Sequence, residues 1–78
     1  MTMPRSGLLD RRLGAILRTG HVVLWSVPQG EGGSSLAYRA VFDPDDEFRT
    51  SVPAHRTAPH DTPAACLVEI CDALERFV

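Results

Sequence analysis

The segment that most constrains the fold is residues 35–42, an alternating run with turn residues on both sides. One set of its alternate positions is mostly apolar and is expected to face the core: Leu36, Tyr38, Ala40 and Phe42. The preceding connection, residues 29–34, is rich in glycine, and Asp43-Pro44 begins a turn after the run. Turns at both ends of a strand reverse the direction of the chain, so we expect hairpins and antiparallel neighbouring strands.

Two further segments are expected to supply these neighbours. Residues 21–27 are rich in β-branched and aromatic side chains on both faces, which predicts a strand that is central or covered by a helix. Trp25 belongs to this segment and is expected to be largely buried. Residues 48–52 are expected to form a short third strand, followed by an irregular loop over residues 53–61.

Helical patterns stand near both ends of the chain. Residues 6–19 have an apolar stripe at helical spacing, formed by Leu9, Leu13, Ile16 and Leu17. Ser6 is expected to cap this helix, and Gly20 is expected to end it in a left-handed conformation. A second helix is expected after the N-cap candidate Thr62, with Pro63 at its first position. Its apolar face consists of Leu67, Ile70, Cys71, Leu74, Phe77 and Val78.

Together these patterns predict an α+β fold with the order α-β-β-β-α. The three strands are expected to form an antiparallel sheet on which the two helices pack. The 78 residues are enough for one domain, residues 1–78, in which residues 1–5 are expected to be a frayed terminus. A chain this small can gain buried area by dimerising, so a homodimer is compatible with the pattern.

The sequence also bears on the cellular compartment. The amino end lacks the apolar core of a signal peptide, and no apolar stretch is long enough to span a bilayer, so we expect a cytoplasmic protein without membrane contact. Cys66 and Cys71 are separated by about 140° around a helix, which prevents a disulfide between them. Both are expected to be reduced, buried thiols. All eight cationic side chains are arginines, which is typical of a GC-rich bacterial or phage genome.

Charge suggests two alternative binding surfaces. The net charge of −2 does not favour non-specific binding to nucleic acid. The acidic residues of the turn and of the last helix are expected to meet a partner protein with a basic surface, and they are Asp45, Asp46, Glu47, Glu69 and Asp72. In the alternative interpretation, the first helix binds nucleic-acid phosphates through Arg11, Arg12 and Arg18.

Motifs for catalysis or metal binding are weak. His55, His60, Cys66 and Cys71 could supply zinc ligands, but the cysteine spacing does not suit a shared ion. The acidic turn, which we define as residues 43–47, lacks the glycine that a calcium-binding loop needs. The two histidines could serve a small His-dependent hydrolase, yet the sequence has neither a nucleophile elbow nor a phosphate-binding loop. We therefore expect no enzyme, no cofactor and no metal, with both histidines exposed in a loop.

One stretch of the chain follows the pattern of a known family. It contains the strand Tyr38 to Phe42, the acidic turn, Ser51-Val52-Pro53, and Asp61-Thr62 at a helix start, with Ala73-Leu74 further on. Through these features, residues 36–76 resemble the partner-binding domain of HicB-type antitoxins. The resemblance implies a β-β-β-α core that binds and masks a small basic ribonuclease toxin.

These observations favour a small non-catalytic regulator or inhibitor that binds another protein and masks it. An antitoxin is one form, and a phage-encoded inhibitor of a host defence nuclease complex is another. The acidic residues would steer either onto a surface that normally holds nucleic acid. The alternatives are a nucleic-acid-binding regulator that uses the first-helix arginines and, with less support, the hydrolase.

Overall fold

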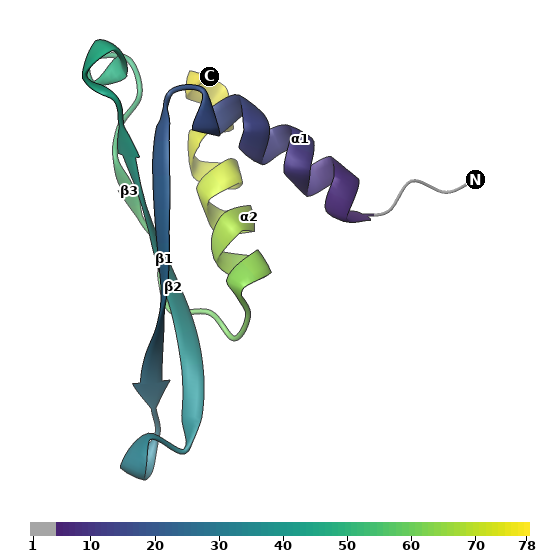
Figure 1. Ribbon diagram of the computed structural model, residues 1–78, viewed down its shortest axis with the longest axis vertical. Coiled ribbons are helices and arrows are strands. Elements are labelled where there is room, and N and C mark those ends of the chain that lie inside the picture. Colours follow the sequence, from purple (N-terminus) through teal and green to yellow (C-terminus); the bar gives the residue numbers. More distant parts are fainter. Residues whose placement is uncertain (1–4) are drawn as a thin grey trace.

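The computed structural model describes residues 5–78, with side chains from Leu8 onward, and confirms the α-β-β-β-α order of an α+β domain (Figure 1). Its helices and strands are α1 Arg5–Leu17, β1 Gly20–Gln29, β2 Ser35–Pro44, β3 His55–Arg56 and α2 Pro63–Leu74. Short 3-10 turns occur at Glu31–Gly33, Asp46–Phe48 and Glu75–Phe77. α1 begins before Ser6, the expected cap, and the rest of the terminus expected to be frayed, residues 1–4, lies outside the described residues.

The sheet is antiparallel and has the strand order β1-β2-β3. The β1–β2 ladder is unbroken over ten residue pairs, from Gly20 opposite Pro44 to Gln29 opposite Ser35. β3 adds two pairs on the other side of β2, and an isolated bridge joins Tyr38 to His60. β2 is therefore the central strand and β1 is an edge strand. Of the two alternatives given for residues 21–27, a central strand or one covered by a helix, the first is wrong.

The third strand lies further along the chain than the sequence predicts. Residues 48–52 form a turn in which the Phe48 carbonyl accepts hydrogen bonds from the amides of Ser51 at 3.0 Å and Val52 at 2.8 Å. Phe48 and Val52 are four residues apart, a spacing that brings side chains together in a helical turn as well as on one strand face. Both pack on the core, so burial alone did not distinguish a turn from a strand. β3 instead lies in the segment expected to be an irregular loop.

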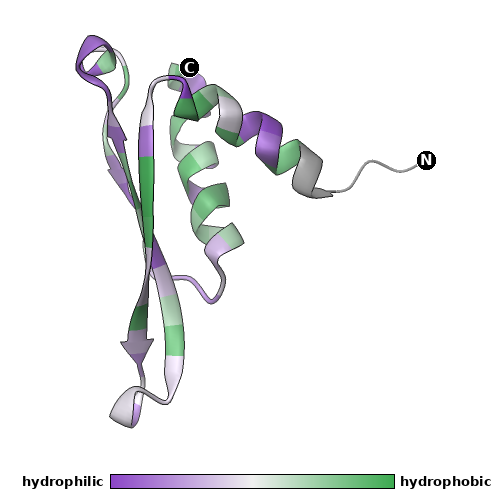
Figure 2. Ribbon diagram, viewed as in Figure 1, coloured by the Kyte–Doolittle hydropathy of each residue, from purple (hydrophilic) through white to green (hydrophobic). Residues whose placement is uncertain are grey.

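Both helices lie on the same side of the sheet, where the core is formed (Figure 1). The buried residues that form the core are Ile16, Ala40, Phe42, Val52, Cys66, Ile70, Cys71 and Leu74. Figure 2 shows the corresponding concentration of apolar residues along α2 and the strands that face it. In the described part of the chain, neither helix is long and apolar enough to cross a membrane.

The core face of β2 is only partly as expected. Ala40 and Phe42 are fully buried and Tyr38 is half-buried, but Leu36 is 53% exposed. The β1–β2 hairpin continues beyond the amino end of α2 (Figure 1). Leu36 lies opposite Pro28, one residue pair from the end of the ladder at the hairpin connection. The helical layer is therefore shorter than the strands it covers.

The helix ends follow local chemistry. The Thr62 hydroxyl accepts a hydrogen bond from the Ala65 amide at 3.2 Å, and Pro63 begins α2, which confirms the predicted cap. At the end of α1, the buried Thr19 donates from its hydroxyl to the Ile16 carbonyl at 2.7 Å. Thr19 therefore satisfies a carbonyl at the end of this helix.

Gly20 has a different role from the one expected. It is the first residue of β1 and does not have a positive φ angle, so it is not a left-handed helix cap. A Cβ atom at this position would lie 2.7 Å from both Phe42 Cζ and Pro44 Cα, and closer still to the Asp43 carbonyl oxygen. Glycine is needed here because β1 and β2 approach each other closely where the core begins.

Candidate functional site

The face of the sheet opposite the helices is an uncovered apolar surface. Successive strand residues point to opposite faces, so the neighbours of the buried Ala40 and Phe42 point away from the helices. Directly opposed residues share a face, and the register pairs Val23 with Val41 and Val27 with Ala37. We call this surface the open face and define it by Val23, Trp25, Val27, Ala37 and Val41.

Exposure differs across the open face. Val23 is 54% exposed, Trp25, Val27 and Val41 are half-buried, and Ala37 is buried. Figure 1 shows that no described helix lies over this side of the sheet. Trp25 was expected to be largely buried, but it is only half-buried because the sheet has no second layer here.

Two arginines accompany the apolar residues of the open face. Arg39 lies opposite Trp25, and Arg56 lies opposite Val41. Arg39 is half-buried and donates from Nε to the Thr57 carbonyl at 3.3 Å, whereas Arg56 is exposed. The open face therefore combines apolar residues with two cations.

The acidic turn lies at one end of the β1–β2 ladder. Its backbone is tied to the α1–β1 junction, because the Asp45 amide donates to the Thr19 carbonyl at 2.8 Å. Arg49 neutralises part of the turn, with Nε 2.8 Å from Asp46 Oδ1. Asp45 and Glu47 are exposed and form no ion pair within the described residues. Of the three predicted turn residues, these two are available to a partner.

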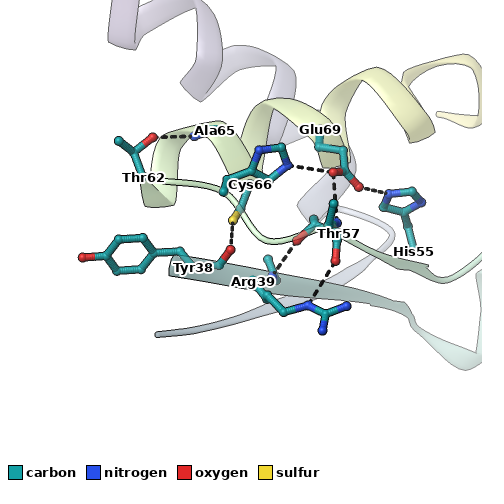
Figure 3. A network of polar contacts seen from close by, with 11 residues as sticks. Tyr38, Arg39, His55, Thr57, Thr62, Ala65, Cys66 and Glu69 are labelled. Carbon is teal, nitrogen blue, oxygen red and sulfur yellow. Dashed lines mark hydrogen bonds and ion pairs between the residues drawn. The ribbon is translucent and has the colours of Figure 1, made fainter. Parts of the chain in front are cut away.

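Glu69 lies at the centre of a polar cluster that joins α2 to the β3 region (Figure 3). Its carboxylate accepts hydrogen bonds from His55 Nε2 at 2.6 Å and His60 Nε2 at 2.7 Å. The Ala58 amide also donates to it at 3.1 Å. Both histidines are half-buried, so the expectation that they are exposed loop residues was wrong. Glu69 was predicted to face a partner, but its carboxylate has three donors within the chain.

The cluster changes the acidity of Glu69. Burial raises the pKa of Glu69, but the hydrogen bonds from His60, His55 and Ala58 have the larger combined effect, so the pKa lies below its ordinary value. The carboxylate is therefore ionised at neutral pH. Its charge holds both imidazole rings in place and fastens α2 to the chain that follows β3.

Neighbouring polar contacts hold the same two elements against β2. The Thr57 hydroxyl accepts a hydrogen bond from the Ala40 amide at 2.9 Å, and Cys66 donates from Sγ to the Tyr38 carbonyl at 3.0 Å (Figure 3). Cys66 and Cys71 are both buried and free, in agreement with their spacing on the helix. Burial also raises the pKa of the Cys71 thiol, which favours its protonated, unreactive form.

The remaining acidic residue predicted on α2 pairs with α1. Asp72 Oδ1 lies 2.6 Å from Arg12 Nη2, and Glu75 Oε2 lies 2.8 Å from the same nitrogen. These hydrogen bonds raise the pKa of Arg12, because both carboxylates favour its charged form. The structure thus brings Asp72 and Arg12 together, although they were assigned to two alternative sites.

The other two arginines of the predicted nucleic-acid surface are exposed. Arg11 lies on α1, and Arg18 lies just beyond its end. Arg12 is already neutralised by two carboxylates, so the positive charge available here is smaller than the sequence indicates. The sequence could not show this pairing because 60 residues separate Arg12 from Asp72.

Neither a metal site nor a similar known protein assigns a function to the chain. Within residues 5–78, no three or more His, Cys, Asp or Glu side chains are grouped so that they could hold a metal ion. No family model, curated protein or solved structure matches the chain. Function is therefore inferred from the open face and the charged residues around it.

Proposed function

We propose that this protein is a small non-catalytic regulator that binds another protein through the open face and masks it. The observation that supports this proposal most strongly is the uncovered apolar side of the β1–β2 hairpin. Val23 is 54% exposed there, next to the half-buried Trp25. Apolar patches on a protein surface mark protein-binding sites, and tryptophan is enriched among the residues that dominate binding energy.

The acidic turn supports a partner with a basic surface. Gly20 pairs with Pro44 at the end of the β1–β2 ladder, so the turn that follows Pro44 adjoins the open face. Asp45 and Glu47 can attract a basic partner and speed its encounter, while the apolar residues provide contact area. A basic ribonuclease toxin or a nuclease complex has this chemistry. We therefore propose an antitoxin, or a phage inhibitor of a defence nuclease, acting in the cytoplasm.

The test is quantitative capture of proteins from the source organism by the immobilised full chain. Val23→Glu introduces a charge into the open face at an exposed position, so the fold should persist. The matched control is Val68→Glu, because Val68 is 38% exposed on α2 and lies away from the open face. We expect one stoichiometric protein to be retained by the wild type and the control and lost with Val23→Glu.

The steering role of the acidic turn has its own test. Asp45→Asn with Glu47→Gln should slow association with the captured protein several-fold at low salt and have little effect at high salt. Glu31→Gln is the control, because Glu31 is exposed at the other end of the hairpin.

If Val23→Glu and Val68→Glu retain the same proteins equally, the open face is not the binding surface and the proposal fails.

A further inference from the structure

The outer edge of β1 exposes a regular row of backbone hydrogen-bonding groups. On β2, Tyr38 exchanges backbone hydrogen bonds with His60 at 2.7 and 2.9 Å, and the Ala40 carbonyl accepts from the Thr57 amide at 2.9 Å. Tyr38 and Ala40 therefore turn their backbone groups toward the side of β2 on which β3 lies. Alternate residues of a strand turn these groups to opposite sides. Arg39 and its ladder partner Trp25 consequently face each other across the β1–β2 pair.

This alternation fixes which groups of β1 point outward. Trp25 and the residues two positions away bond to β2, so Val22, Leu24 and Ser26 direct their amides and carbonyls to the free edge. Pro28 belongs to the same outward set, but it has no amide hydrogen and cannot donate a hydrogen bond at the free edge. Outside the β1–β2 ladder, no backbone or side-chain group of the described residues bonds to these three amides.

Over residues 20–27, the edge lacks the usual features that prevent strands from pairing. Residues 20–27 contain no Asp, Glu, Lys or Arg, and no proline. The register runs from Gly20 to Gln29 without a bulge. Natural edge strands are normally protected by charges, prolines, bulges or short length. A regular ten-residue edge without charge is well suited to pair with another strand.

We infer that β1 pairs antiparallel with β1 of a second copy of this chain, about a two-fold axis at Leu24. This register sets the outward groups of Val22 opposite those of Ser26 in the second copy, and each pair exchanges two hydrogen bonds. Pro28 then falls opposite Gly20, at the ends of the ladder. A register centred on Ser26 would set Pro28 opposite Leu24 and lose bonds in the middle. The dimer joins two three-stranded sheets into one of six strands.

Side chains and charges also fit a second copy. The register sets Val23 of each copy against Trp25 of the other, and β-branched and aromatic residues pair favourably across antiparallel strands. The antiparallel direction places the acidic turn of each chain beside the far end of the other β1. A ten-residue strand spans about 33 Å, so the two acidic turns are well separated in a screened solution.

The area of this contact indicates a weak dimer. An edge about 33 Å long and about 10 Å deep covers roughly 330 Å² on each chain, well below the ~800 Å² of a standard interface. We therefore expect a dissociation constant on the order of 100 µM. The inference does not depend on the proposed function, because the open face stays uncovered in this dimer.

Two measurements on the full chain test the inference. NMR measures the hydrogen exchange of individual amides, and sedimentation measures the oligomeric state. At about 10 µM, the amides of Val22, Leu24 and Ser26 should exchange quickly, while those of Val23 and Trp25 stay protected. At about 1 mM, sedimentation should show a dimer, and the three outward amides should become at least several-fold more protected.

Two pairs of variants separate the edge from the rest of the sheet. Ser26→Pro removes an outward amide that β1 does not use in its ladder with β2, so it should weaken dimerisation at least ten-fold, and Ser26→Ala should not. Leu24→Lys places like charges at the two-fold axis and should also prevent the dimer. Leu36→Lys is its control, because Leu36 lies on the same sheet face but on β2.

Three results would overturn the inference. A chain that remains monomeric at about 1 mM does not pair through β1 at all. A dimer whose outward amides stay unprotected uses another surface, such as the open face. Protection of these amides only when a different protein is added would show that the edge receives a strand from that protein instead.

Discussion

The two faces of the β1–β2 hairpin have similar sequences and different surroundings. Phe42 is completely buried beneath α2, whereas its neighbour Val41 is half-buried on the open face. On β1, Val22 packs against the core, while Val23 is 54% exposed. Apolar character alone therefore does not show which strand residues are buried in the core, because helices cover only one face of the sheet.

Element lengths add a second difference along the hairpin. The ten residues of β1 span about 33 Å, whereas the twelve residues of α2 rise only about 18 Å. The part of the hairpin beyond α2 therefore has no helix over it, and Leu36, on its helix side, is 53% exposed. Together the two differences separate a core that stabilises the fold from a surface that is free to bind.

The largest effect is expected from truncation on the covered face. Phe42→Ala leaves a cavity among fully packed neighbours and should lower the free energy of unfolding by about 3–5 kcal/mol. Val23→Ala removes methyl groups from an exposed position and should change it by less than about 0.5 kcal/mol. Urea denaturation monitored by circular dichroism measures both values. Comparable losses in the two variants would mean that the open face is packed in solution.

The close approach at Gly20 gives the next effect. Gly20→Ala must displace the backbone of Asp43 and Pro44 and the Phe42 ring, and should destabilise the fold by about 1–3 kcal/mol. Gly14→Ala is the matched control, because Gly14 lies in α1 and an added Cβ would meet nothing within 4 Å. That control should stabilise the protein by about 0.5–1 kcal/mol. If thermal melts show that Gly20→Ala and Gly14→Ala change the stability in the same direction, the close approach at Gly20 is contradicted.

The Glu69 cluster should have a smaller effect that depends on pH. Glu69→Gln removes the charge that both histidines contact and should cost about 1 kcal/mol at neutral pH, because solvent reaches the cluster. The lowered pKa of Glu69 contributes stability that is fully present above its ordinary value of 4.5 and is lost as pH falls through the folded-state pKa. Urea melts from pH 7 to pH 3 should therefore show the two proteins converging in acid. A constant difference would show that the carboxylate charge is not responsible.

The smallest effect is expected at the α1–α2 ion pairs. Arg12→Gln breaks the contacts with Asp72 and Glu75, which are exposed and therefore screened by salt. The melting temperature should fall slightly at low salt and match the wild type at high salt. Arg18→Gln, at an exposed position without a described ion pair, is the control. A loss that persists at high salt would indicate packing of the Arg12 stem instead.

Local signals in the sequence predicted most of the fold. The alternation of residues 35–42, the Thr62 cap and the α2 stripe up to Leu74 each depend on neighbours a few residues away, so they could be read directly. Phe77 and Val78 were expected on the same apolar face, but they lie beyond α2 and are exposed. The third strand could not, because Phe48 and Val52 fit a buried turn equally well. The Glu69 cluster and the Arg12 pairs join residues from separate elements, and nothing in the spacing of those residues indicated the contacts.

The open face was only partly visible in the sequence. The apolar residues on both sides of residues 21–27 were recognised, but they were interpreted as evidence for a strand that is central or covered by a helix. Two helices on the same side of a sheet leave the other side bare, and which side each helix takes depends on the tertiary fold. The same arrangement explains why Trp25 is half-buried.

The most direct test of the open face as a binding surface follows Trp25 itself. Trp25 is the only tryptophan of the chain, so incorporation of 5-fluorotryptophan gives one fluorine NMR signal. In the free chain at low concentration, this signal should shift between H₂O and D₂O because solvent reaches the half-buried ring. In the complex with the captured protein, the signal should move and lose its solvent shift. A complex that forms while the signal and its solvent shift remain unchanged would contradict the account.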